Sequence, residues 1–172
     1  MVWPGGSLVD WDQLPTTDSE IVNACRRDYL QLASSSGSTK GSPADRALAL
    51  QDSQVRLAWA QVHCSNYSDV VDGAALAEGL ISKPDAIVGQ SDRYLHELTY
   101  IAAVGRFRTG SYSKARRLLQ DAAHGGARQM LALLSEVEQR MVNEGLIGMG
   151  VVMAAGGVLV GVVAAAVAGA RR

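Results

Sequence analysis

Apolar residues recur at every third or fourth position through most of the chain, the spacing that places them on one face of an α-helix. The pattern predicts six helices, over about residues 17–33, 43–64, 67–81, 91–109, 112–124 and 127–143. No segment alternates between apolar and polar residues beside a hairpin turn, so no strand is expected. The sequence therefore predicts an all-α fold, an antiparallel array of six helices joined by short connections.

Several predicted helix ends carry residues that favour a boundary. Thr17 and Glu20 fit a capping box at the first helix. Ser42 followed by Pro43 fits a cap and a first helical position, and Asp52–Ser53 marks a point at which the second helix would break. The polar stretch 34–42 between these helices is expected to be a flexible loop.

The last part of the chain differs from the rest because residues 145–170 contain no charged residue and no Asn, Gln, Ser or Thr. A bilayer core of about 30 Å needs roughly 20 apolar residues, so this run predicts one membrane-spanning helix. The opposite interpretation, a buried core helix, lacks a partner segment of matching hydrophobicity. Residues 171–172 are arginines that can reach the headgroups. The expected organisation is an arm over 1–16, a cytosolic domain over 17–143 and a tail anchor.

The predicted anchor is rich in Gly, Ala and Val, which makes it only moderately hydrophobic. Gly157 and Gly161 form a GxxxG that would let two copies of the helix associate, although such a match arises easily in a Gly-rich segment. A moderately hydrophobic anchor with a basic end suits the mitochondrial outer membrane and peroxisomes, with a plastid surface as a further option.

Composition excludes several functions. The net charge is −1, and the part of the chain before the two terminal arginines is more acidic still. An acidic domain does not favour binding to nucleic acid. Cys25 and Cys64 are expected to be reduced, buried, small apolar residues. The chain contains no HExxH, CxxC or GxxxxGK[ST] motif, and its three histidines are scattered. No enzymatic activity, metal, cofactor or small-molecule substrate is therefore expected.

A basic cluster stands out between the fourth and fifth predicted helices. It comprises Arg106, Arg108, Lys114, Arg116 and Arg117, with no acidic residue between Leu98 and Gln120. It would either meet an acidic partner or anionic lipid, or form a solvated outer face of two helices. The second interpretation is favoured because Arg116 and Arg117 follow an expected buried Ala115.

Residues 102–122 fit one tetratricopeptide repeat, in which small residues let two helices approach and aromatic residues fill the wedge between them. The residues expected to pack in this way are Trp59, Ala103, Gly105, Phe107, Gly110, Tyr112 and Ala115. A second, weaker copy covers 58–80, with Tyr67 in the place of Tyr112. Stacked repeats of this kind present a concave groove that binds peptides or partner helices.

These residues resemble a known family. Residues 101–108, IAAVGRFR, followed by Tyr112–Arg116, look like the signature of the mitochondrial fission 1 protein family. Residues 143–150 are similar to its entry into the membrane, 55–63 resemble its second helix, and Trp11 with 18–27 is similar to its plant and algal branch. The resemblance covers residues 11–172. The chain departs from the family pattern at 34–52, 90–92 and 109–110, which leaves the details of the groove open.

The resemblance implies a function. Such proteins are tail-anchored adaptors of the mitochondrial outer membrane and peroxisomes that help recruit a dynamin-related GTPase, directly or through a linker protein, for organelle fission. It also implies a groove between the second and fourth helices, for which the candidates are Leu57, Gln61, Tyr94, Leu98, Ile101 and Arg108. The N-terminal arm, with Trp3 and Trp11, would lie in that groove and regulate access to it.

Two alternatives remain open. A tail-anchored receptor that reads targeting peptides in organelle protein import would have the same fold class and would bind amphipathic presequences. A helical regulator of the apoptosis type also ends in a tail anchor, but it requires a central apolar hairpin that the sequence lacks.

Overall fold

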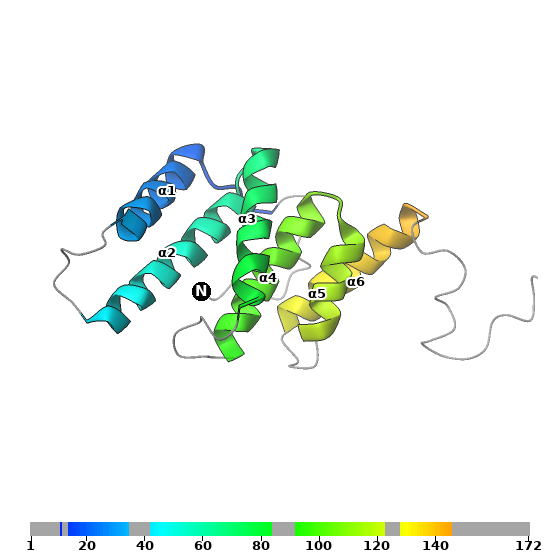
Figure 1. Ribbon diagram of the computed structural model, residues 1–172. Coiled ribbons are helices and arrows are strands. Elements are labelled where there is room, and N and C mark those ends of the chain that lie inside the picture. The colour runs from blue at the N-terminus through cyan, green and yellow to red at the C-terminus, as the bar shows by residue number, and fades with distance from the viewer. Residues whose placement is uncertain (1–10, 12–13, 35–41, 84–91, 123–127, 146–172) are drawn as a thin grey trace, which may run out of the picture.

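The computed structural model describes residues 11, 14–34, 42–83, 92–122 and 128–145. These residues form six helices, as the periodicity predicts: α1 (Ser19–Ser34), α2 (Pro43–Val62), α3 (Tyr67–Ile81), α4 (Asp92–Arg108), α5 (Tyr112–Ala122) and α6 (Arg128–Asn143). The helices lie in a row in chain order (Figure 1). Within the described ranges, extended pairing is limited to one bridge between Thr17 and Cys64. The predicted six-helix, tetratricopeptide-like array is confirmed.

The start of α2 follows the predicted chemistry. The Ser42 hydroxyl accepts a hydrogen bond from the Asp45 backbone N–H, and the Asp45 carboxylate accepts one from the Ser42 N–H, each at 3.1 Å. Pro43 is the first helical residue, where a missing N–H costs nothing. The helix then continues through Asp52–Ser53 without the expected break, and the Ser53 hydroxyl donates to the Leu50 carbonyl at 2.6 Å.

The start of α1 differs from the prediction. The Asp18 carbonyl accepts the first helical hydrogen bonds, from Ile21 and Val22, so Asp18 and not Thr17 stands at the cap. The Thr17 N–H instead donates to the His63 carbonyl at 2.7 Å. This long-range contact holds Thr17 in an extended conformation, which no local pattern reveals.

Helix α4 lies at the centre of the core. It supplies Leu98, Ile101, Ala102, Ala103, Val104 and Phe107 to one cluster that also includes residues of α2, α3, α5 and α6. Two glycines allow the helices to approach closely. A Cβ on Gly105 would come within 2.7 Å of the Ala74 Cβ, and one on Gly73 would come within 2.9 Å of the Ala58 carbonyl oxygen. The small residues of the repeat therefore set the spacing between helices.

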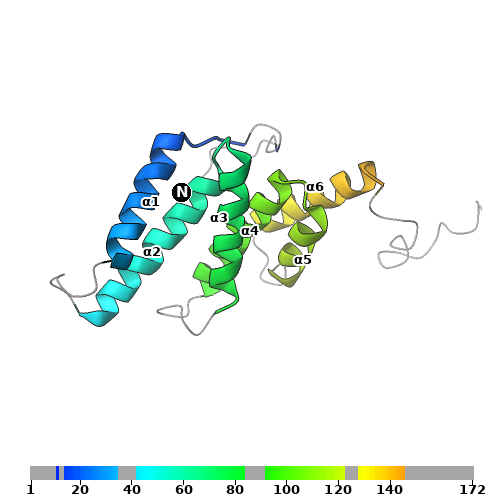
Figure 2. The ribbon, with the colours of Figure 1, turned by 45° about the horizontal axis from the view of Figure 1, so that its top comes forward.

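The six helices form two stacked pairs with a helix at each end. Helix α2 packs against α3 and α4 against α5, while α2 also contacts α4 and α4 contacts α6. The helices α2, α4 and α6 thus share one face of the array, and α3 and α5 lie on the other. Figure 2 shows α1 alongside α2 at the outer end of this row.

The predicted tail anchor, residues 145–170, lies outside the described part of the chain except for Gly145. Among the described helices, none is long and apolar enough to cross a bilayer. The assignment of residues 145–170 to the membrane therefore stays a prediction from the sequence.

Candidate partner-binding face

Phe107 is the centre of an aromatic cluster at the α4–α5 turn. Its ring lies 5.7 Å from the ring of Tyr112 and 6.1 Å from that of Trp11, and the Arg140 guanidinium stands 5.7 Å from its centroid. Gly110, with φ at +70°, makes the turn between the helices. One aromatic side chain therefore joins α4, α5, α6 and the N-terminal arm.

The structure places most of the predicted packing residues of the repeat inside the array. Ala103, Gly105, Phe107 and Ala115 are buried, and Tyr112 packs against the same core from its edge. Gly110 is exposed, as a turn residue is expected to be. These positions hold the hairpin together and do not themselves form a binding surface.

Trp59 is not in the core, and that prediction is wrong. Its side chain is 40% exposed and stacks on the His63 ring, with ring centroids 4.4 Å apart and planes inclined by 26°. The cause is helical register. Ala58 is fully buried, and each residue turns the helix by about 100°, so the next side chain points past the core. The spacing of Trp59 and His63, one helical turn apart, was the sequence signal for this stack.

Four of the six predicted groove residues are buried and do not line an open groove. Leu57, Gln61, Leu98 and Ile101 have exposures between 0 and 5%. Gln61 faces α3, where its Cβ would meet a Cβ on Gly73 at 2.7 Å. The error has a physical reason: α4 has helices around most of its circumference, so its apolar residues belong to the core on several sides.

The other two predicted groove residues, Tyr94 and Arg108, are partly exposed. The Tyr94 hydroxyl donates to the Gln51 carbonyl at 3.3 Å, and burial raises the pKa of this tyrosine to about 12. The Arg108 guanidinium donates to the Val62 carbonyl at the end of α2, and burial lowers the pKa of Arg108. Both side chains therefore tie α4 to α2 as well as reaching the surface.

Trp59, His63 and Arg108 form what we call the Trp59 face. His63 Nδ1 lies 2.8 Å from the Trp59 carbonyl oxygen, and because a carbonyl only accepts, Nδ1 carries the hydrogen. Burial lowers the pKa of His63, and the charge of Arg108 lowers it further. At neutral pH this face consequently presents an exposed indole beside a neutral imidazole and a fixed cation.

The described part of the N-terminal arm docks beside this face. Trp11 meets Phe107 edge-on, Leu14 packs on the same core, and Thr17 is hydrogen-bonded to His63 through the backbone. Trp11 therefore docks on Phe107, which is not one of the predicted groove residues, and the placement of the arm in the groove stays a prediction. Trp3 lies outside the described residues.

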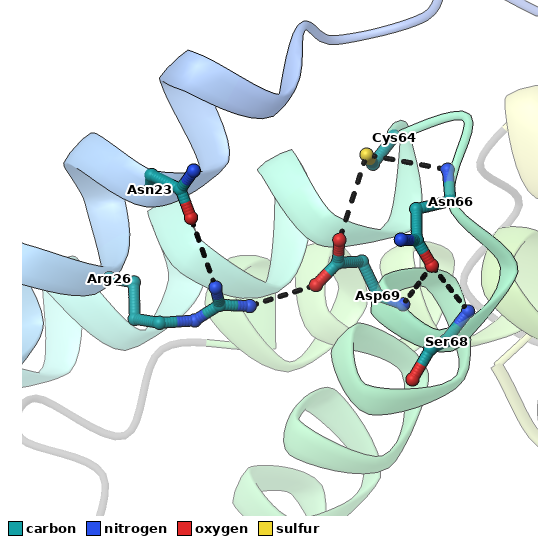
Figure 3. Close-up of polar contacts among 6 residues, drawn as sticks. All are labelled: Asn23, Arg26, Cys64, Asn66, Ser68 and Asp69. Atoms are coloured by element: carbon teal, nitrogen blue, oxygen red, sulfur yellow. Dashed lines mark hydrogen bonds and ion pairs between the residues drawn. The ribbon is translucent and has the colours of Figure 1, made fainter.

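A polar network ties α1 to the start of α3 (Figure 3). Arg26 pairs with Asp69 at 2.8 Å, and the Cys64 thiol lies 3.9 Å from the other Asp69 oxygen. The Asn66 side chain accepts from the Ser68 and Asp69 backbone N–H groups and caps α3. This network is structural: each of its polar groups serves a cap or a contact between helices.

Two of the five residues of the basic cluster are paired with carboxylates. Arg106 forms a two-pronged contact with Glu78 at 2.6 Å, and Arg116 pairs with Glu138 at 3.1 Å. The Arg106 guanidinium lowers the pKa of Glu78 below its ordinary value. Lys114 and Arg117 are exposed. The arrangement favours the interpretation of this cluster as a solvated outer face with ion pairs across helices.

Among the described residues, no group of three or more His, Cys, Asp or Glu side chains is placed to hold a metal ion. What the array does present is the Trp59 face, next to a docked arm. The molecule is by these features a helical scaffold of the tetratricopeptide class.

Comparisons with known proteins narrow this class. The family described as Fis1 C-terminal tetratricopeptide repeat matches residues 96–146. Mitochondrial fission 1 protein B of Arabidopsis thaliana is 31% identical over 165 residues, which cover 94% of this chain and 87% of the relative. Mitochondrial fission 1 protein A of the same plant is 30% identical over 161 residues, which cover 92% of this chain and 86% of the relative.

Solved structures agree in fold. The fission protein Fis1 from Saccharomyces cerevisiae superposes with a TM-score of 0.61 at 18% identity, over 85% of this chain and 97% of that one. A second structure is yeast Fis1 in complex with an Mdv1 fragment containing N-terminal extension and coiled coil domains. It gives the same TM-score at 17% identity, over 84% of this chain and 99% of that one. This chain belongs to the mitochondrial fission 1 protein family.

Proposed function

We propose that this protein is an adaptor, held by its C-terminal tail in the mitochondrial outer membrane and in peroxisomes, that brings a dynamin-related GTPase or its linker protein to the organelle and promotes fission. The observation that carries the proposal is the relationship to the two plant mitochondrial fission 1 proteins over nearly the whole chain. It also favours fission over the alternative of an import receptor for targeting peptides.

The Trp59 face is the surface we assign to the partner. Tryptophan and arginine contribute much of the binding energy where proteins meet, and Trp59 is the one tryptophan among the seven large apolar side chains that the described helices leave exposed. Yeast Fis1, of the same fold, has been crystallised with an Mdv1 fragment, which supports a protein partner for this scaffold as well.

The arm is proposed to regulate the same surface. Thr17 is fixed on His63, so the residues before it leave from the edge of the Trp59 face. Deletion of residues 1–15 is expected to change partner affinity, because it removes the Trp11 contact with Phe107 and keeps the Thr17 bond. Partner binding that is unchanged after this deletion would argue against a regulatory arm.

The anchor and the fission role are tested by imaging. The full chain with a fluorescent N-terminal tag is compared with a chain ending at Asn143, while mitochondrial and peroxisomal lengths are measured. We expect the full chain to coat and fragment the organelles and the shortened chain to be diffuse. Coating without any change in organelle number would favour the import receptor, and two diffuse proteins would rule out the tail anchor.

The assignment of the Trp59 face has a matched control. Trp59→Ala is expected to abolish fragmentation while the protein still coats the organelle. Tyr67→Ala removes another exposed ring, 66% accessible at the start of α3, and is expected to act like the unmodified protein. If both variants fragment the organelles equally well, the partner does not bind through Trp59.

A further inference from the structure

The α2–α3 hairpin opens along its length into a pocket. Near the turn the helices touch, since a Cβ on Gly73 would come within 2.7 Å of the Gln61 Cβ. Away from the turn α2 and α3 lie farther apart (Figures 1 and 2), and a Cβ on the exposed Gly79 would meet no atom within 4 Å. The space between the diverging helices is a pocket of about 470 Å³, lined by Ala47, Leu50, Gln51, Gln54, Ala75, Leu76, Gly79, Leu80 and Lys83.

The pocket is mostly apolar, with two glutamines, Gln51 and Gln54, and one charged residue in its lining. Leu50, Leu76 and Leu80 are half-buried in its sides, and Lys83, which is exposed, is its only charged lining residue. Its volume lies within the range of small-molecule sites, roughly 300–1,000 Å³. An apolar slot that ends at a lone cation complements a molecule with an extended hydrocarbon chain and one negative charge.

We propose that this pocket binds a long-chain fatty acid, with the acyl chain between α2 and α3 and the carboxylate paired with Lys83. The site is separate from the Trp59 face. Gln54 and Trp59 are five residues apart on α2, which places them about 140° apart around the helix axis. A ligand in the pocket therefore leaves the proposed partner surface uncovered, and the two assignments stand or fall independently.

The test is photo-crosslinking of the full-length protein with a palmitate analogue that carries a diazirine on its chain, followed by peptide mass mapping. We expect labels within residues 47–54 and 75–83. The apolar run at 145–170 provides an internal control for non-specific labelling in every sample. Unlabelled palmitate should compete for the pocket labels and not for those in the tail.

Gly79→Leu is the variant that decides the site. Its side chain enters open space, so the pocket is filled without a clash, and replacement of a helical glycine should raise the melting temperature by about 2–4 °C. Labelling at 47–54 and 75–83 is expected to fall to background, with tail labelling kept. Ala132→Leu adds the same side chain at an exposed position of α6 and should label like the unmodified protein.

Lys83→Gln tests the charge. Loss of an exposed ion pair should lower labelling by the acid about twofold to fivefold and leave labelling by the matching fatty alcohol unchanged. Unaltered pocket labelling in Gly79→Leu, or labels confined to the tail, would overturn the proposal. The proposal would also be overturned if the acid and the alcohol labelled the pocket equally and Lys83→Gln changed neither. That result would favour a slot for an apolar side chain of a protein.

Discussion

The two helical hairpins, α2–α3 and α4–α5, each carry a tyrosine at the same place, but the two tyrosines differ in exposure. Tyr67 and Tyr112 each begin the second helix, 45 residues apart. Tyr112 packs against the core with its ring 5.7 Å from Phe107, whereas Tyr67 is 66% exposed. The residue 45 positions before Phe107 is Val62, which has no ring.

The repeat tyrosine packs against the core in the hairpin whose first helix has an aromatic side chain near its end, and it is exposed in the hairpin whose first helix has none there. Aromatic pairs at 4.5–7 Å gain about 0.5–1.5 kcal/mol beyond the area they bury, and a valine offers no such contact. The α4–α5 hairpin thus has an aromatic contact that Tyr67 lacks in the α2–α3 hairpin.

The largest expected effect comes from removal of that ring. Phe107→Ala should lower the free energy of unfolding by about 3–5 kcal/mol, because Phe107 is 6% exposed and contacts Trp11, Tyr112 and Arg140. Tyr67→Ala is the control and should change it by less than about 0.5 kcal/mol. Urea denaturation of residues 1–144, monitored by circular dichroism, measures the unfolding free energy of both variants. Similar losses in the two variants would remove the distinction between the hairpins.

The next effect tests the close approach in the first hairpin. Gly73→Ala should cost about 1–3 kcal/mol of unfolding free energy, because the new Cβ would stand 2.9 Å from the Ala58 carbonyl oxygen and the Val62 nitrogen, which are backbone atoms that cannot move alone. Gly79→Ala, in open space on the same helix, should stabilise by about 0.5–1 kcal/mol. A stabilising Gly73→Ala would show that α2 and α3 can separate at the turn without cost.

Much of the fold could be predicted from the sequence because periodicity and caps are local. The six helices and the Ser42 cap follow from neighbouring residues. The side chains of α4 were harder to place, since a helix packed on several sides has no single apolar stripe. Leu98 and Ile101 were therefore assigned to a groove and lie in the core.

The contacts between distant segments could not be predicted at all. Thr17 looks like a helix cap in sequence, yet its N–H is used by the His63 carbonyl. Arg106 looks like part of a basic patch, yet Glu78 lies 28 residues earlier and neutralises it. Which of these groups meet depends on how the hairpins pack against each other, and the spacing of residues along the chain does not predict that packing.

The Arg106–Glu78 pair joins the two hairpins and predicts an acid-sensitive link. The pKa of Glu78 is lowered from its ordinary value of 4.5 by the hydrogen bonds from Arg106. The pair therefore stabilises the folded state above pH 4.5, and this stabilisation is lost as the pH falls through the lowered pKa. Glu78→Gln should therefore cost about 0.5–1 kcal/mol at pH 7, an amount limited by solvent screening. The loss should vanish in strong acid. Urea denaturation at both pH values measures this, with the exposed Glu144→Gln as control; a loss that persists in acid would mean that the ion pair is not its cause.

The smallest effect concerns the residue that takes the same place in the first hairpin as Arg108 takes in the second. His63, 45 positions earlier, is buried and its pKa lies below the ordinary 6.5, so its contribution to stability is complete above that pH and falls as the pH drops toward the lowered value. Protonation would place a second cation beside Arg108 at the point where Thr17 docks.

Between pH 7.5 and 5.5 the unmodified protein should consequently lose a little stability, less than the Glu78→Gln variant loses at pH 7, and His63→Gln should flatten that change. His96→Gln, on the half-exposed side of α4, should keep the pH dependence of the unmodified protein. The urea midpoints of the three proteins at the two pH values measure the difference. If His63→Gln keeps the full pH dependence, another group titrates, and the first hairpin has no proton-sensitive counterpart to the permanent charge of Arg108.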